Sequence, residues 1–165
     1  MLNTKNITHI DLFAGPGGVS TGFRAAGIKT LAAVEKVESC TETFAKNHLF
    51  VNIIHKDIRS VVKDDFGDMP SEVDIVTAGV PCETFSTAGS SSRSFYDHRQ
   101  TLFNDAIRIA KYFHAKFLII ENVPAIQTKC ISKHSKERVV DILYKALIDA
   151  GYSKADSTLK CNFCK

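Results

Sequence analysis

The sequence predicts an α/β domain in which a mostly parallel sheet carries helices on both faces. Short apolar runs alternate along the chain with amphipathic segments of helical length. A glycine-rich turn at 11–18 follows the first apolar run and precedes the first helical segment, as in Rossmann-like folds. The chain has 165 residues, 44% of them hydrophobic, so we expect one Rossmann-like domain over 1–165.

The predicted strands are short runs rich in Ile, Val, Leu and Phe that end at glycine or at polar residues. In chain order they are 7–13, 30–34, 51–55, 73–78 and 116–120. Helical segments separate most of these runs. This order favours parallel pairing, because a parallel strand needs a crossover connection, usually a helix.

The predicted helices are 19–26, 38–47, 99–114 and 135–150. Gly27 and Gly151 follow the first and the last of them, and glycine at that position commonly ends a helix. In the third helix the apolar positions are occupied by Leu102, Phe103, Ile107 and Tyr112. These residues predict the face that packs on the sheet.

The bulk composition excludes several classes of protein. No apolar run approaches the roughly 20 residues of a membrane-spanning helix, and residues 1–8 show no signal-peptide pattern. The five cysteines, an odd number, argue against a disulfide framework. We therefore expect a cytoplasmic protein with no membrane partner. A net charge of +3 and a pI near 8.6 permit a nucleic-acid partner without demanding one.

The ends of the predicted strands indicate a ligand site. Glycines in 11–18 let the backbone approach a ligand, although tight strand–helix turns need glycine as well. Glu35 ends the second strand, where Rossmann-like folds hold a ribose hydroxyl pair. Asp57 follows the third strand and can accept a hydrogen bond from an exocyclic adenine amine. Since parallel strands share one carboxyl edge, we expect Gly15, Glu35, Asp57 and Gly79 to lie there.

Cys82 is the candidate nucleophile. It follows Pro81 at the end of the strand 73–78 and opens a loop rich in Ser and Gly. A thiol attacks as the thiolate, and a strand end beside helix N-termini favours that anion. A lone cysteine is more often inert and buried, but Phe85 and Ser86 after it shift the interpretation toward a nucleophile.

Glu121 is the candidate acid. It ends the apolar run 116–120 and precedes Asn122. A carboxyl group in an apolar wall has a raised pKa, which suits proton donation. The alternative is a carboxylate that caps the helix that follows.

A metal site is a weaker interpretation. Cys161 and Cys164 have a CxxC spacing that occurs in zinc sites, with Cys130 or His134 as further candidate ligands. The chain has no second CxxC, so we predict no metal.

Taken together, these segments resemble the DNA (cytosine-5) methyltransferases over nearly the whole chain. The segment DLFAGPGG at 11–18 resembles the S-adenosylmethionine loop of that family. The segment PCETFS at 81–86 resembles its catalytic Pro-Cys motif, and ENV at 121–123 resembles its Glu-Asn-Val motif. The spacing of these motifs and the order of the strands agree with the family as well.

The resemblance implies an S-adenosylmethionine-dependent methyltransferase fold, with S-adenosylmethionine as cofactor and double-stranded DNA as partner. It implies that the Cys82 thiolate adds to C6 of a flipped-out cytosine, while Glu121 contacts the N3/N4 edge and supports protonation of N3. The residues implied for the cofactor site are Phe13, Ala14, Gly15, Gly17, Gly18, Glu35, Asp57, Ile58, Gly79 and Leu102. Those implied for the base and the DNA are Pro81, Ser86 and Asn122.

The chain also departs from the family pattern. Lys36 stands where many members have a bulky aromatic residue, so adenine packing should differ. The chain has no Gln-x-Arg-x-Arg segment and no target-recognition region. We therefore expect the catalytic part of a larger or split restriction–modification enzyme, with a second polypeptide that carries the target-recognition region. A tRNA cytosine-5 methyltransferase and an inactive truncated product remain as alternatives.

Overall fold

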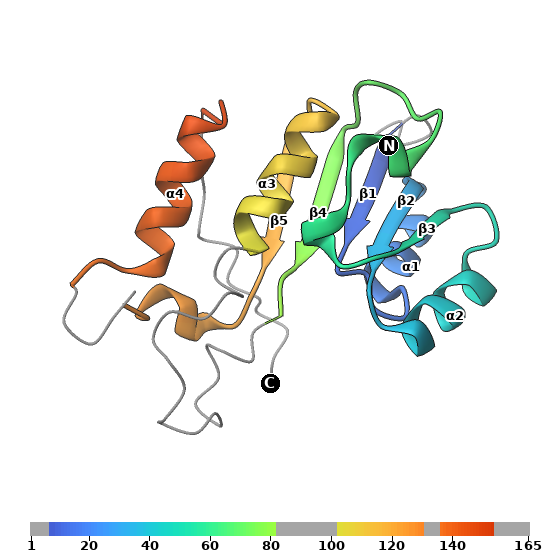
Figure 1. The fold of residues 1–165 in the computed structure, drawn as a ribbon, viewed down its shortest axis with the longest axis horizontal. Helices are drawn as coiled ribbons and strands as arrows, with labels where there is room; N and C mark the ends of the chain where they lie inside the picture. Colours follow the sequence, from blue (N-terminus) through green and yellow to red (C-terminus); the bar gives the residue numbers. More distant parts are fainter. Residues whose placement is uncertain (1–6, 82–101, 131–135, 154–165) are drawn as a thin grey trace.

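The sheet of this protein is parallel throughout, with the strand order β3-β2-β1-β4-β5 (Figure 1). It is seen in a computed structural model that describes residues 7–81, 102–130 and 136–153. The strands are β1 (Thr8–Leu12), β2 (Lys29–Glu35), β3 (Asn52–His55), β4 (Ile75–Gly79) and β5 (Phe117–Glu121). All the predicted strands are present, and the predicted fold class is confirmed.

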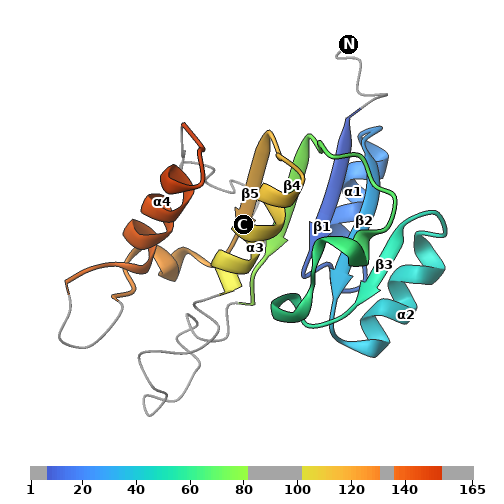
Figure 2. The same ribbon diagram turned by 45° about the horizontal axis from the view of Figure 1, so that its top comes forward.

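Helices cover both faces of the sheet (Figures 1 and 2). They are α1 (Gly18–Ala25), α2 (Glu38–Asn47), α3 (Leu102–Tyr112) and α4 (Val139–Asp149), with 3₁₀ turns η1 (Ile58–Ser60), η2 (Lys63–Phe66) and η4 (Pro124–Gln127). α1 and α2 lie on one face, α3 lies on the other, and α4 lies beside α3. None of the helices in the described ranges is long and apolar enough to cross a membrane.

The main core lies between the sheet and α3. The apolar positions predicted for this helix are buried at Leu102, Phe103 and Ile107, whereas Tyr112 is half-buried. Phe113, just after α3, meets Phe66 edge to face with ring centroids 4.8 Å apart. Burial of these large rings against Ile10, Leu12 and Val76 fixes α3 on the sheet.

The ends of several elements differ from the predicted ones. β4 begins at Ile75 rather than at 73, because Val73 pairs with the chain around α3 and β5: its N–H donates to Phe113 O (2.9 Å) and its carbonyl accepts from Lys116 N–H (3.3 Å). α4 begins at Val139 rather than at 135, next to the Arg138–Asp141 ion pair. The predicted start of the third helix, 99–101, lies outside the described residues.

The strand order creates a switch point between β1 and β4. The chain leaves β1 toward β2 on one side, whereas β4 and β5 continue the sheet on the other. In open parallel sheets a ligand binds outside the carboxyl ends of the strands at such a point. The glycine-rich turn follows β1, and the segment that leads to Pro81 follows β4.

Candidate active site

The glycine-rich turn is shaped by left-handed backbone conformations. Phe13 has φ 57°, Gly15 has φ 53° and Gly17 has φ 97°. The turn is closed by hydrogen bonds from Ala14 N–H to Val34 O (3.1 Å) and from Gly17 N–H to Ala14 O (3.0 Å). A Cβ atom at Gly15 would meet nothing within 4 Å. The turn therefore leaves open space beside its backbone, which lets a ligand approach closely.

The turn has a glycine at 17 and another at 18, and the surroundings of the two positions differ. At Gly18 a Cβ atom would meet nothing within 4 Å, so that space is open to a ligand. At Gly17, by contrast, a Cβ atom would lie 2.6 Å from His48 Nε2 and 2.8 Å from a ring carbon of Phe44. The same His48 Nε2 lies 3.2 Å from Gly17 O. Gly17 is therefore required by the end of α2 that packs on the turn.

Glu35 braces the turn from the end of β2. Its Oε2 accepts a hydrogen bond from Gly15 N–H (2.9 Å), and its Oε1 accepts from Lys36 N–H and Val37 N–H (both 2.8 Å). A carboxylate offers about four acceptor sites, so one site on Oε2 is left. Glu35 can thus hold the turn and still accept from one ribose hydroxyl.

Asp57 lies at the start of η1, beyond the end of β3. Its Oδ1 accepts from Arg59 N–H (3.1 Å) and Nε–H (2.9 Å), and its Oδ2 accepts from Arg59 Nη2 (2.7 Å). Hydrogen bonding to the Arg59 side chain lowers the pKa of Asp57 to about 2. The carboxylate therefore remains ionised at neutral pH, with one acceptor site left on Oδ2. Ile58, next in the chain, is buried, as is Leu102 at the start of α3.

The carboxyl ends of β4 and β5 lie side by side. Gly79 pairs in register with Glu121, and a Cβ at Gly79 would lie 3.8 Å from Phe13 O of the turn. Asn122 joins the two strand ends: its Nδ2 donates to Val80 O (3.0 Å), and its Oδ1 accepts from Val123 N–H (2.9 Å). The structure thus fixes the chain up to Pro81. Cys82 and Ser86 lie outside the described residues.

Glu121 is exposed, and the expectation of a carboxyl group in an apolar wall is wrong. On its face of β5, Phe117 is 63% and Ile119 is 40% exposed. The apolar run looked buried in sequence because periodicity does not tell which face of a strand is covered. The capping alternative fails too, because the residue that begins η4 is Val123.

A buried polar network beneath the turn escaped the sequence reasoning. Asp11 Oδ2 accepts from Ser20 N–H (3.2 Å) and Ser20 Oγ–H (2.6 Å), and Asp11 Oδ1 accepts from Thr77 Oγ1–H (3.0 Å). Burial raises the pKa of Asp11, while these hydrogen bonds oppose that rise. Ser20 is in the first turn of α1, so the carboxylate also lies at the favourable end of the helix dipole.

His9 extends the network to β2. Its Nε2 lies 2.8 Å from Thr77 Oγ1, and its Nδ1 lies 2.9 Å from Thr30 Oγ1. Since the Thr77 hydroxyl proton goes to Asp11, the Thr77 oxygen accepts from His9 Nε2–H, and Nδ1 accepts from Thr30. Burial lowers the pKa of His9 to about 4, so the ring is neutral. The signal in the sequence was two polar residues alternating with apolar ones in one strand.

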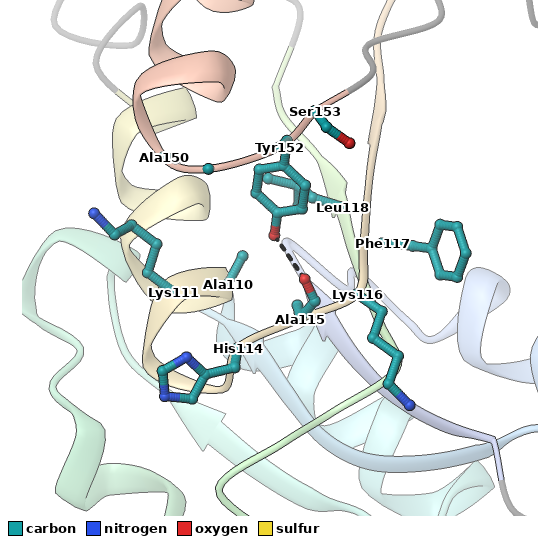
Figure 3. Close-up of a pocket in the computed structure, with 11 residues that line it drawn as sticks. Ala110, Lys111, His114, Ala115, Lys116, Phe117, Leu118, Ala150, Tyr152 and Ser153 are labelled. Carbon is teal, nitrogen blue, oxygen red and sulfur yellow. Dashed lines mark hydrogen bonds between the residues drawn. The ribbon is translucent and has the colours of Figure 1, made fainter.

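A separate cleft of about 530 Å³ lies between the ends of α3 and α4 and the start of β5 (Figure 3). Tyr152 projects into it and donates from Oη to Ala115 O (3.1 Å). The cleft is at the amino end of β5, whereas Glu121 is at its carboxyl end. It therefore takes no part in the candidate active site.

Comparison with known families and proteins agrees with this geometry. Residues 7–165 match the family model described as C-5 cytosine-specific DNA methylase. The chain is 36% identical to the type II methyltransferase M.DdeI of Desulfomicrobium norvegicum, covering 87% of this chain and 34% of that protein. It is 38% identical to M.FnuDI of Fusobacterium nucleatum, covering 87% of this chain and 39% of that protein. The chain thus spans little more than a third of the length of these relatives.

Solved structures with the same fold include a protein described as an E. coli prophage DNA modification methyltransferase. Its TM-score is 0.66 at 26% identity, covering 87% of this chain and 38% of that one. A variant of DNMT2 from Spodoptera frugiperda has a TM-score of 0.61 at 18% identity, covering 88% and 41%, respectively. The second likeness concerns the fold alone.

Proposed function

Because this chain belongs to the C-5 cytosine-specific DNA methylase family, we propose that it transfers a methyl group from S-adenosylmethionine to C5 of cytosine in DNA. The observation that carries the proposal is the meeting of several groups at one edge of the sheet. Glu35 and Glu121 end their strands, and the open glycine turn and Asp57 follow theirs, so all of them lie at the carboxyl ends of parallel strands. This edge is where open α/β sheets bind their ligands.

The residues at this edge fit the cofactor. Open space beside Gly15 and Gly18 suits close approach of a ligand to the backbone. The acceptor left on Glu35 suits a ribose hydroxyl, and the one left on Asp57 suits the exocyclic amine of adenine. When bound, S-adenosylmethionine supplies an electrophilic methyl group.

The chemistry on the base falls to Cys82 and Glu121. The Cys82 thiolate forms a bond to C6 of cytosine, and the displaced ring electrons make C5 nucleophilic. Glu121 contacts the N3/N4 edge and supports the proton on N3, which stabilises the charge passed into the ring. After methylation of C5, loss of the C5 proton returns an electron pair to the ring and expels the Cys82 sulfur.

Asn122 has a supporting role in this proposal. Its amide holds the carbonyl of Val80, two residues before Cys82. A fixed strand end limits where the nucleophile can lie, and positioning of this kind contributes much of the rate in enzymes.

We also propose that target recognition resides in further polypeptide, in the same or a second chain. Two observations support this. The relatives are far longer than the matched region. The exposed side chains Phe117 and Ile119 leave an apolar face of β5 that a partner segment can cover.

The test is methyl transfer from labelled S-adenosylmethionine to unmethylated DNA, with this chain alone and with the target-recognition polypeptide added. We expect label on DNA with the wild type and with Cys40→Ser, a control in α2, but none with Cys82→Ser. DNA containing 5-fluorocytosine should trap a covalent adduct in the same pattern. Equal transfer by Cys82→Ser would refute the assigned nucleophile.

The same assay separates the alternatives. Transfer to tRNA in preference to DNA would establish the tRNA enzyme instead. A folded chain that forms no adduct under any of these conditions would be the inactive product.

A further inference from the structure

We propose that Arg108, on α3, is a positioning residue that holds the turn carrying Asp57 and Ile58. Its Nη2 donates to Ile58 O (2.8 Å), and its Nη1 donates to Val61 O (2.7 Å). Both acceptors are backbone carbonyls of the segment that contains η1. The inference deepens the proposed function and rests on it, because that turn is one wall of the proposed cofactor site.

The turn is also restrained from within, by Arg59 N–H, which donates to Asp57 Oδ1 (3.1 Å), and by three further hydrogen bonds. Ser60 N–H and Ser60 Oγ–H donate to Asp57 O (2.9 and 2.8 Å), and Val61 N–H donates to Ile58 O (3.2 Å). The side chains of Ile58 and Val61 are 3% and 1% exposed, so they anchor the turn on the core side. Arg108 supplies the polar anchor from the helix, at both ends of the segment 58–61.

The guanidinium of Arg108 is itself held in place. Asp105 Oδ1 accepts from Arg108 Nη2 (2.9 Å) and Nε (3.3 Å), and Tyr112 Oη accepts from Nη1 (2.9 Å). Each terminal nitrogen thus serves one backbone carbonyl and one side chain. A lysine ammonium presents its donors from a single point and cannot span these acceptors, so charge alone does not explain the arrangement.

The link to the ligand runs through Asp57. The family resemblance implies both Leu102, at the start of α3, and Asp57, at the start of η1, for the cofactor site, and Arg108 fixes the helix to that turn. A shift of the turn moves the remaining acceptor of Asp57 away from the adenine amine. Loss of Arg108 should therefore lower the affinity for a ligand that carries the amine more than the affinity for a ligand that lacks it.

The experiment compares wild type, Arg108→Met, Arg108→Lys and Lys111→Met by titration calorimetry. Lys111, exposed on the same helix, is the matched control. The probes are S-adenosylhomocysteine and S-inosylhomocysteine, which carries a carbonyl in place of the amine. The wild type should prefer the adenine compound. Arg108→Met should lose about tenfold in affinity for it, the loss for one misplaced hydrogen bond of about 1.4 kcal/mol, and less for the inosine compound.

The pattern of affinities decides the role. Collapse of the adenine preference in both Arg108 variants, with Lys111→Met unchanged, supports the proposal. An equal loss of affinity for both probes leaves the adenine preference unchanged. That result means a merely structural role for Arg108 and overturns the proposal. If Arg108→Met does not fold, the affinities of Arg108→Lys for the two probes decide the role of Arg108.

Amide hydrogen exchange gives a second readout that needs no ligand. Arg108→Met should accelerate exchange at Ser60 and Val61 while leaving Ile10 and Leu12 of β1 unchanged. Unchanged protection at Ser60 and Val61 would overturn the positioning role of Arg108, whatever the binding data show. If Arg108→Met accelerates this exchange but the wild type binds neither probe, Arg108 holds the turn, whereas the cofactor proposal fails and the ligand role of Arg108 fails with it.

Discussion

Gly17 offers a sharp test of the turn geometry, because the reason for a glycine there is packing against α2. Its φ of 97° is a left-handed conformation, which costs a residue with a Cβ atom about 1–2 kcal/mol. The added Cβ would also lie 2.6 Å from His48 Nε2 and 2.8 Å from Phe44. Overpacking of this kind costs about 1–3 kcal/mol. Gly17→Ala should therefore lower the free energy of unfolding by about 2–5 kcal/mol.

Gly22 provides the matched control, because it lies in α1 with nothing within 4 Å of its Cβ position. Gly22→Ala should raise the free energy of unfolding by about 0.5–1 kcal/mol, the usual gain of alanine over glycine in a helix. Urea unfolding followed by far-ultraviolet circular dichroism measures both variants.

A third variant separates the backbone strain at position 17 from the overlap of the added Cβ atom with His48. If His48 causes the overlap, Gly17→Ala should cost less in a His48→Ala background, and the two changes should couple in a double-mutant cycle. The packing argument is wrong if Gly17→Ala stays within about 0.5 kcal/mol of the wild type, the range of ordinary surface substitutions.

Two further predictions concern the buried network and the strand ends. His9 has a folded pKa of about 4 against 6.5 when unfolded, so between these pH values the unfolded chain binds one proton more than the folded chain. The free energy of unfolding should therefore fall by about 3 kcal/mol as the pH drops from 6.5 to 4. Urea unfolding at several pH values measures this slope, which His9→Gln should flatten; an unchanged slope would exclude His9 as its source. Asn122→Ala frees Val80 O and should reduce the yield of the Cys82 adduct with 5-fluorocytosine DNA roughly 10- to 100-fold, with affinity for S-adenosylhomocysteine unchanged. Asn104→Ala, exposed on α3, is its control, and equal adduct yields in the two variants would contradict the positioning role.

The parallel sheet and the edge at which the proposed site residues meet could be predicted from sequence, because topology leaves little choice. Once strands alternate with helices, their carboxyl ends share an edge, so residues placed directly after strands meet there. Glu35, Asp57 and Gly79 lie at that edge for this reason. The prediction needed only the ends of the apolar runs, and small errors in the bounds did not affect it.

The environments of individual side chains were harder to predict from the sequence. The sequence predicts a buried run at β5, yet Phe117, Ile119 and Glu121 are exposed. Arg108 could not be recognised, because its acceptors are backbone carbonyls 47 and 50 residues away, and backbone groups carry no signal in the sequence. Asp11 was read only as part of the glycine segment, whereas its burial beneath α1 gives it a structural role.

Two of the carboxylates proposed to meet the cofactor are already held by the protein's own hydrogen-bond donors. Glu35 accepts three hydrogen bonds from N–H groups of the turn and of the start of α2. Asp57 accepts three from Arg59, one from its backbone and two from its side chain. Each keeps one acceptor in a fixed place, so little side-chain ordering is left to occur on binding. Preorganisation of this kind strengthens binding by lowering its entropic cost. It follows that a substitution at Arg108, which lies behind Asp57, should weaken the binding of a ligand that Arg108 itself is not proposed to contact.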